Sequence, residues 1–246
     1  MRAWPFPDPR QTDPHGLLCY GGDLAPERVL AAYAQGVFPW YENDPVLWHS
    51  PDPRMLLVPG DLRVNRTLGK NLRRALYTIR VDTEFRAVVE ACRDADRTGQ
   101  DGTWITNDMV EAYCALFELG YGHSFEAWLG DELVGGIYGL SLGAAFFGES
   151  MFSHARDASK IAFVHLVEQI EAWDFHFLDC QVHTPNTELL GAQEWSRDDY
   201  MEALDRALGV PTRVGRWELL PELVREPPPA RTSRGRVLGA AGGTPR

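Results

Sequence analysis

The sequence predicts an α+β fold, in which a small N-terminal α/β domain at about residues 1–62 packs on a larger domain at about 63–221. The larger domain is expected to hold a mixed, mostly antiparallel sheet flanked by helices. Three strand-like segments follow one another between residues 123 and 150, joined by short turns as in an antiparallel meander. Segments with helical periodicity lie before and after them, and 246 residues suffice for a real core.

The N-terminal part is expected to contain one helix between irregular stretches. Residues 1–22 are rich in Pro and Gly. Residues 24–36 are typical of a helix, because Pro26 suits its first turn and Gly36 its C-terminal stop. Residues 37–54 combine prolines with large aromatic side chains. We expect them to form an ordered loop that is held by packing rather than by regular hydrogen bonding.

The larger domain is expected to alternate helices and strands. In order, these are a basic helix within 62–76, a strand at 77–82, helices at 83–97 and 106–120, strands at 123–130, 132–140 and 144–150, a helix at 157–173, a strand at 177–184 and a helix at 197–208. Thr106 suits the N-cap of its helix. After the basic helix, the order β-α-α-β-β-β-α-β-α matches the acyltransferase architecture called GNAT. Residues 222–246 contain few large apolar side chains, which predicts a disordered tail.

Charge is unevenly distributed along the chain. The net charge of −11 by itself argues against a nucleic-acid partner. A local excess of basic residues begins at Arg54 and runs to Arg80, and within it Arg66, Lys70, Arg73 and Arg74 fall at helical spacing. One interpretation is a solvated cationic helix. In so acidic a protein, however, such a stripe is also suited to attract a polyphosphate ligand to one surface.

Several classes of protein are disfavoured by composition. No apolar run approaches the roughly 18 residues of a membrane helix, and the first residues contain no hydrophobic signal region, so we expect a cytoplasmic protein. The four cysteines form no C-x-x-C pair, and the seven histidines form no H-E-x-x-H cluster. We therefore expect reduced thiols and no metal site. We also expect a monomer.

Asp179 and Gln181 are the first candidates for chemistry. They interrupt an apolar strand two residues apart, so their side chains are expected on one face. A structural explanation is a carboxylate at a sheet edge with an amide that bonds a nearby loop. Burying a carboxylate is costly, however, and it then needs partners. A carboxylate positioned in this way can orient or deprotonate an incoming amine.

A second candidate is Glu149, which ends an apolar strand among Phe146, Phe147, Met151 and Phe152. This surrounding predicts a largely apolar pocket with one charged wall. The structural alternative is a solvated Glu at a strand end.

Ser159 and Lys160 stand at the predicted start of a helix, a place that favours phosphate or carboxylate. The pyrophosphate loop of GNAT acetyltransferases is absent from the sequence, which counts against acetyl-CoA as donor.

The sequence resembles the leucyl/phenylalanyl-tRNA–protein transferase family. The resemblance rests on seven blocks in the family's order at 16–41, 47–57, 102–106, 123–140, 146–153, 158–162 and 178–184. The most specific pair is GESMFS with DCQ. The chain departs from the family pattern at Trp48-His49, where paired tryptophans are usual, and at Trp195-Ser196. Neither departure removes a proposed catalytic residue.

The resemblance implies an enzyme that moves Leu or Phe, sometimes Met, from aminoacyl-tRNA to a protein's N-terminal Arg or Lys, which creates a degradation signal. It implies no metal and no coenzyme, because the tRNA carries the activated ester. Family roles map onto this chain as follows: Asp179, Gln181 and Glu149 are catalytic, with Glu149 helping to hold the acceptor; Trp40, Trp104, Ile137, Phe146 and Met151 form the donor side-chain pocket; Arg66, Lys70, Arg73 and Arg74 contact the tRNA acceptor stem.

Two other functions fit parts of the sequence. The first is a GNAT enzyme that uses acyl-CoA. Such an enzyme would bind coenzyme A, and an assay of coenzyme A binding tests this function. A non-catalytic tRNA-binding module would bind tRNA in a salt-sensitive way without transferring an amino acid.

Overall fold

The computed structural model describes residues 5–95 and 105–226, and its strands form two sheets. The smaller sheet has the order β1-β3-β2 and the larger one β10-β4-β9-β8-β7-β6-β5. The strands are β1 (Leu17–Tyr20), β2 (Phe38–Pro39), β3 (Leu47–His49), β4 (Arg54–Leu57), β5 (Thr78–Val81), β6 (Gly122–Leu129), β7 (Glu132–Leu142), β8 (Ala145–Ser153), β9 (Phe177–Gln181) and β10 (Gln193–Trp195). All pairings in the larger sheet are antiparallel except that of β8 with β9.

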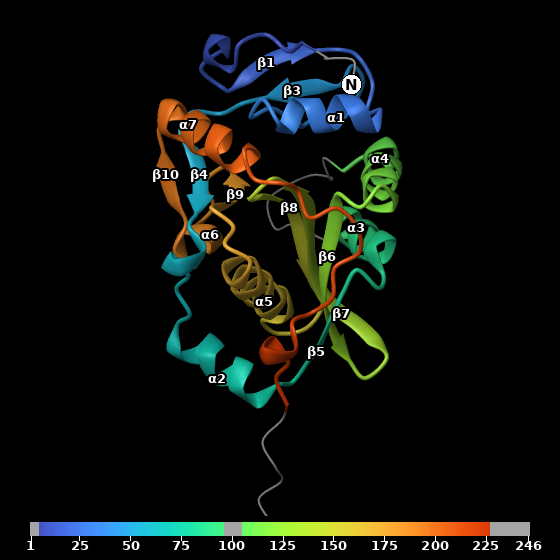
Figure 1. Ribbon diagram of the computed structural model, residues 1–246. Helices are drawn as coiled ribbons and strands as arrows, with labels where there is room; N and C mark the ends of the chain where they lie inside the picture. The colour runs from blue at the N-terminus through green and yellow to red at the C-terminus, as the bar shows by residue number, and fades with distance from the viewer. Residues whose placement is uncertain (1–4, 96–104, 227–246) are drawn as a thin grey trace, which may run out of the picture.

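The helices cover both faces of the larger sheet (Figure 1). They are α1 (Pro26–Tyr33), α2 (Arg66–Arg74), α3 (Phe85–Asp94), α4 (Asn107–Glu118), α5 (Ala158–Ala172), α6 (Pro185–Leu189) and α7 (Arg197–Leu208). One apolar core joins α1, α3, α4 and α7 to one face of the sheet. A second core packs α2 and α5 against the other face. This is the α+β architecture predicted from the sequence, with a separate N-terminal part.

The predicted order of elements in the larger domain is confirmed. The meander is formed by β6, β7 and β8, and α5 and β9 follow it as expected. Thr106 caps α4 by accepting a hydrogen bond from the Met109 amide at 3.2 Å. The short elements α6 and β10 were not predicted, because a few residues are too short to show a period.

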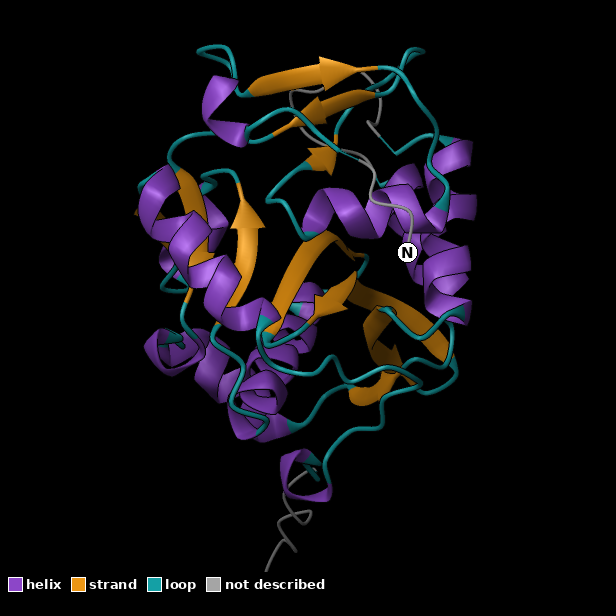
Figure 2. Cartoon of the chain, turned by 45° about the horizontal axis from the view of Figure 1, so that its top comes forward, coloured by secondary structure: helices purple, strands orange, loops and turns teal. Residues whose placement is uncertain are grey.

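The N-terminal part is more regular than the sequence suggested. Residues 1–22 were expected to be irregular and 37–54 to form a loop, yet β1 to β4 lie within or at the end of these ranges. The strands are so short that alternation of side chains cannot reveal them. Figure 2 shows the small sheet lying across the top of the molecule.

The predicted domain limits stay predictions. The boundary at about residue 62 falls after β4, whereas the hydrogen bonding changes from one sheet to the other between His49 and Arg54. Of the predicted tail at 222–246, only residues up to 226 are described. In this part Arg225 pairs with Glu168 on α5 at 2.6 Å.

Candidate active site

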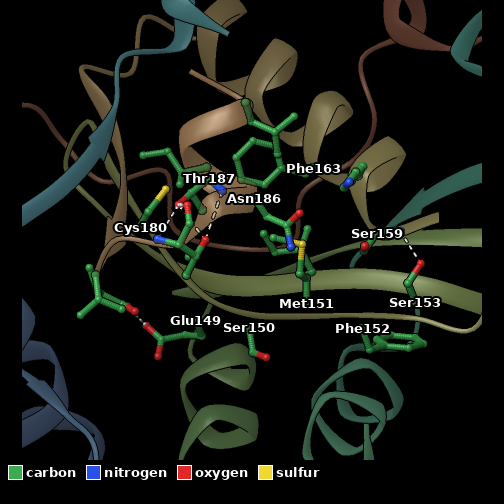
Figure 3. Close-up of a pocket in the computed structure, with 18 of the residues that line it drawn as sticks. Glu149, Ser150, Met151, Phe152, Ser153, Ser159, Phe163, Cys180, Asn186 and Thr187 are labelled. Carbon is green, nitrogen blue, oxygen red and sulfur yellow. Dashed lines mark hydrogen bonds between the residues drawn. The ribbon is translucent and has the colours of Figure 1, made fainter. Parts of the chain in front are cut away.

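A cavity of about 670 Å³ opens where β8 and β9 stop pairing. Their parallel pairing runs from Ala145–Phe177 to Phe147–Asp179, and β8 continues to Ser153. Apolar side chains of the lining include Ile137, Met151, Phe163, Leu178 and Leu190. In Figure 3, Glu149 lies toward one end of the cavity and Ser153 and Ser159 lie toward the other. The site is therefore a cavity with a largely apolar lining and a few polar groups, among them Glu149 at one end, as small-molecule sites usually are.

A β-bulge brings Glu149 to this cavity. Along the pairing of β7 with β8, Tyr138 pairs with Ser150 and Gly139 with Gly148, which leaves Glu149 as an extra residue. A bulge of this kind changes the direction of the side chains that follow it. As a result Phe147 and Phe152, an odd number of positions apart, lie in the same core.

Two tyrosines hold the carboxylate of Glu149. Tyr33 of α1 donates to its Oε1 at 2.6 Å, and Tyr113 of α4 donates to its Oε2 at 2.7 Å. The side-chain amide of Gln181 donates to Oε1 at 3.2 Å. Burial raises the pKa of Glu149 to about 7, although the tyrosine hydrogen bonds act to lower it. The group therefore titrates near neutral pH.

Asp179 lies behind the cavity wall and is fully buried. Arg54 of β4 binds both of its oxygens, with Nε–Oδ1 and Nη2–Oδ2 distances of 2.9 and 2.8 Å. The Tyr200 hydroxyl and the Gln181 backbone amide donate to the same carboxylate, at 3.0 and 2.8 Å. Burial acts to lower the pKa of Arg54, but Asp179 raises it above its usual value, so Arg54 keeps its charge. The pair is a buried, hydrogen-bonded ion pair.

Asp179 and Gln181 lie close together on β9, as expected from the sequence, but their side chains contact different groups. Gln181 has a φ of 62°, a left-handed conformation that is uncommon outside glycine. It lines the cavity, whereas Asp179 does not. The hydrogen bond between them runs through the backbone amide of Gln181 rather than through its side chain. Gln181 thus links the buried ion pair to Glu149.

The residues expected to hold the donor side chain do not all line the cavity. Ile137 and Met151 do, as does Trp40, which is 40% exposed. Phe146 is fully buried in the second core and is not part of the lining. It pairs with Leu178, in the segment where β8 and β9 still close the sheet. Trp104 lies outside the described residues.

The basic side chains expected to meet RNA lie on the exposed face of α2. Arg66, Lys70, Arg73 and Arg74 are all exposed, and the opposite face buries Leu68 and Leu72. Asn71 of the same helix donates to Asp157 at 2.7 Å, at the start of α5. Ser159 and Lys160, just beyond, line the cavity. Arg54, in contrast, is buried against Asp179 and contributes nothing to this surface.

The described part of the chain offers neither a metal site nor a reactive thiol at the cavity. Between residues 5 and 95 and between 105 and 226, no group of three or more His, Cys, Asp or Glu side chains could hold a metal ion. Cys180 lines the cavity, but burial raises the pKa of its thiol, which keeps it protonated. No helix within these residues is long and apolar enough to cross a membrane.

Comparison with known families decides the relationship. The model of the leucyl/phenylalanyl-tRNA protein transferase family matches residues 56–205, and that of its N-terminal domain matches residues 22–52. The chain belongs to this family. Together the two matches include Glu149, Asp179 and Gln181 and the tyrosines that contact the two carboxylates.

Relatives that carry the name of this family are similar to the chain over nearly their whole length. The leucyl/phenylalanyl-tRNA–protein transferase of Myxococcus xanthus is 54% identical over 86% of this chain and 91% of its own. That of Anaeromyxobacter dehalogenans is 54% identical over 87% and 92%. The enzyme named in the same way in Chromobacterium violaceum is 49% identical over 89% of this chain and 97% of its own.

Sequence reasoning missed four side chains of this candidate site. Tyr33, Tyr113, Tyr200 and Arg54 contact the buried carboxylates. The tyrosines lie in ordinary helical segments, and Arg54 begins the basic stretch of the sequence. The available signal was indirect: a buried Tyr hydroxyl needs a partner, and a buried carboxylate needs donors. Neither rule says which residues meet.

Proposed function

We propose that the chain transfers leucine or phenylalanine, and sometimes methionine, from aminoacyl-tRNA to the N-terminal Arg or Lys of a protein. The product carries a new peptide bond and a signal for degradation by the N-end rule pathway. The structural observation that carries the proposal is the apolar cavity that has Glu149 and Gln181 at one end. The transferase family of the chain gives the reaction its class.

The apolar lining suits the donor amino acid. Ile137, Met151 and Phe163 offer contact to an aliphatic or aromatic side chain and no hydrogen bond to a polar one. A cavity of about 670 Å³ is in the range that holds a whole small molecule, so it has room for the terminal adenosine as well. Trp40 supplies an exposed aromatic wall against which a base can stack.

The acceptor amine is assigned to the polar end. An ester on the tRNA ribose is already activated, so the protein mainly has to position the amine and stabilise charge. Glu149 and Gln181 supply a carboxylate and an amide for this purpose. Because Arg54 neutralises Asp179, the preference for an N-terminal Arg or Lys rests on Glu149. Asp179 then acts as a positioning residue that fixes Gln181 through its backbone amide.

The tRNA is assigned to the exposed face of α2. Arg66, Lys70, Arg73 and Arg74 are suited to contact the phosphates of the acceptor stem, which carry no sequence information directly. Lys160, at the cavity wall, adds a further cation near the polar lining. We propose that the enzyme works as a monomer in the cytoplasm and needs no coenzyme, since the tRNA brings the activated ester.

The test is transfer of labelled phenylalanine from Phe-tRNA to a peptide that starts with Arg. The same peptide starting with Ala is the acceptor control, and Asp179→Asn and Glu149→Ala are assayed beside the unmodified chain. We expect transfer to the Arg peptide only, with strong loss in both variants while tRNA binding persists. If the unmodified chain binds tRNA but transfers nothing, it is a binding module and the proposal fails.

A further inference from the structure

The two buried carboxylates of the site differ in how completely they are bonded. A carboxylate offers about four lone-pair positions. Asp179 receives Arg54 on both oxygens, together with Tyr200 and the Gln181 backbone amide. These donors fill its positions, and the residue is fully buried. Asp179 therefore has no position left to take a proton from a substrate.

Glu149 keeps an acceptor position for a substrate. Its Oε1 receives Tyr33 and Gln181, while its Oε2 receives Tyr113 alone among the described residues. Within the same part of the chain, Glu149 is the one carboxylate that lines the cavity. Gln181 uses its amide nitrogen on Glu149, and no described residue donates to its carbonyl oxygen, which is left for a second N–H of an amine.

Resting on the proposed transfer reaction, we propose that Glu149 accepts the proton of the attacking amine and returns it to the leaving ribose oxygen. Tyr33 and Tyr113 are then positioning residues that hold the carboxylate in place. Tyr33 belongs to the N-terminal helix α1 and Tyr113 belongs to α4. Both helices must therefore be packed in place before the carboxylate of Glu149 is held.

The proton balance closes without a further reactant. The acceptor first gives up one proton to solvent and becomes a neutral amine, whose α-amino pKa is about 7.7–8.0. Its nitrogen forms the C–N bond with the ester carbon, and the N–H proton passes to Glu149. The C–O bond to the ribose then breaks, and Glu149 gives that proton to the leaving oxygen. The products are a peptide and a tRNA hydroxyl, and Glu149 is again a carboxylate.

Charged and titratable groups from each packed element face Glu149. They are Tyr33 of α1, Tyr113 of α4, Arg54 of β4 and Asp179 of β9, with Tyr138 of β7 close to Tyr33. Burial raises the pKa of Tyr33 and Tyr113 well above 10.0, so both remain hydrogen-bond donors. Their donation lowers the pKa of Glu149 against the effect of burial, which leaves it at about 7. A general base is most effective with a pKa near the working pH.

The pH profile of kcat/KM separates Glu149 from the amine. Below about pH 6 both groups must lose a proton, so log kcat/KM is expected to rise by about two units per pH unit. In Glu149→Gln only the amine titrates, and the slope is expected to fall to about one. The rate itself is expected to fall by about 10²–10⁴-fold.

The tyrosines give a second and independent readout. Tyr33→Phe and Tyr113→Phe each remove one donor without changing shape, so the pKa of Glu149 is expected to rise and the acidic midpoint to move to higher pH. Tyr200→Phe is the matched control, because it removes the same hydroxyl from a buried contact with Asp179. Tyr200→Phe is expected to keep the acidic midpoint of the unmodified chain, even if its rate of transfer changes.

The outcomes distinguish this inference from the reaction on which it rests. No transfer by the unmodified chain at any pH refutes the reaction. Transfer that keeps a slope of about two in Glu149→Gln, or a midpoint that Tyr33→Phe and Tyr113→Phe leave in place, refutes the role of Glu149. Circular dichroism of each variant checks that it is folded.

Discussion

Arg54 and Asp179 form an ion pair from which water is excluded on both sides. Removing two charges from water costs several kcal/mol, which their attraction and added hydrogen bonds must offset. Here Tyr200 and the Gln181 backbone amide supply those hydrogen bonds. The guanidinium also lies 4.7 Å from the Tyr200 ring centre. The pair thus fixes β4, β9 and α7 together next to Gln181.

The first prediction tests this pair. Arg54→Met leaves a buried carboxylate without its countercharge, so the free energy of unfolding near neutral pH is expected to fall by about 3–5 kcal/mol. The double variant Arg54→Met with Asp179→Asn removes both charges but keeps an acceptor for Tyr200, and is expected to recover much of the deficit. Urea unfolding measures both. A double variant that is no more stable than Arg54→Met would show that the two residues do not depend on each other.

Single residues also show what the sequence could predict about the site. Asp179 and Gln181 were identified because polar side chains inside an apolar strand are costly and thus informative. The family resemblance places Phe146 in the donor pocket, whereas it is buried in the second core where β9 still pairs with β8. The composition of a segment predicts apolar surroundings, but not the point at which two strands separate.

At the scale of elements, α2 shows the clearest division of faces. Leu68, Asn71 and Leu72 are buried, and the four basic side chains of the stripe are exposed. Asn65 caps the helix by accepting a hydrogen bond from the Leu68 amide at 2.9 Å. Its basic residues are therefore not needed to hold the helix on the protein, and they are available for a ligand.

The second prediction concerns this helix. Arg73→Gln with Arg74→Gln removes two cations while Gln keeps a high helix propensity. Binding of tRNA is expected to weaken, and the slope of log affinity against log salt to become shallower by about 0.7–0.9 for each phosphate that the variant no longer neutralises. Arg206→Gln on α7 removes a cation that pairs with Glu202 and is the control. An unchanged slope in the double variant would place the tRNA elsewhere.

The bulge in β8 is an element that periodicity could not reveal. The sequence predicts the strand but places Glu149 at its end, whereas β8 continues to Ser153. It did not show that Glu149 is an extra residue opposite Tyr138 and Gly139. Gly139 suits this place, since a Cβ there would come within 2.1 Å of the Phe147 carbonyl oxygen. Bulges depend on the partner strand, which a one-strand pattern does not contain.

At the scale of the whole molecule, the segment after α7 packs into the second core and helps to stabilise it. The Trp217 ring stacks on the His123 ring, with 3.6 Å between the ring centres. It also meets the Trp173 ring edge-on, with 4.8 Å between the ring centres. Its backbone amide donates to Asp82 at 2.7 Å, and the Gln169 side-chain amide donates to the Glu218 carbonyl at 3.0 Å. This segment therefore ties the sheet to α5 on the face away from the N-terminal helix.

The third prediction compares two tryptophans. Trp217→Ala opens a cavity in a core and is expected to lower the free energy of unfolding by about 3–5 kcal/mol, with kcat/KM little changed while the protein is folded. Trp40→Ala, at the exposed cavity wall, is expected to show the reverse: a smaller drop in stability and a large drop in transfer. Thermal unfolding and the transfer assay measure the two effects. Similar effects in both variants would contradict this division.

The sequence by itself determined the order of the main helices and strands of the larger domain and the N-cap of α4, and it singled out Asp179, Gln181 and Glu149 as polar residues in apolar segments. These follow from local rules, because periodicity, capping and an out-of-place polar residue are visible within one segment. Only the tertiary structure decided which residues serve the carboxylates. Arg54 meets Asp179 across 125 positions and Tyr33 meets Glu149 across 116. Such contacts depend on how whole elements pack, and no local pattern encodes them.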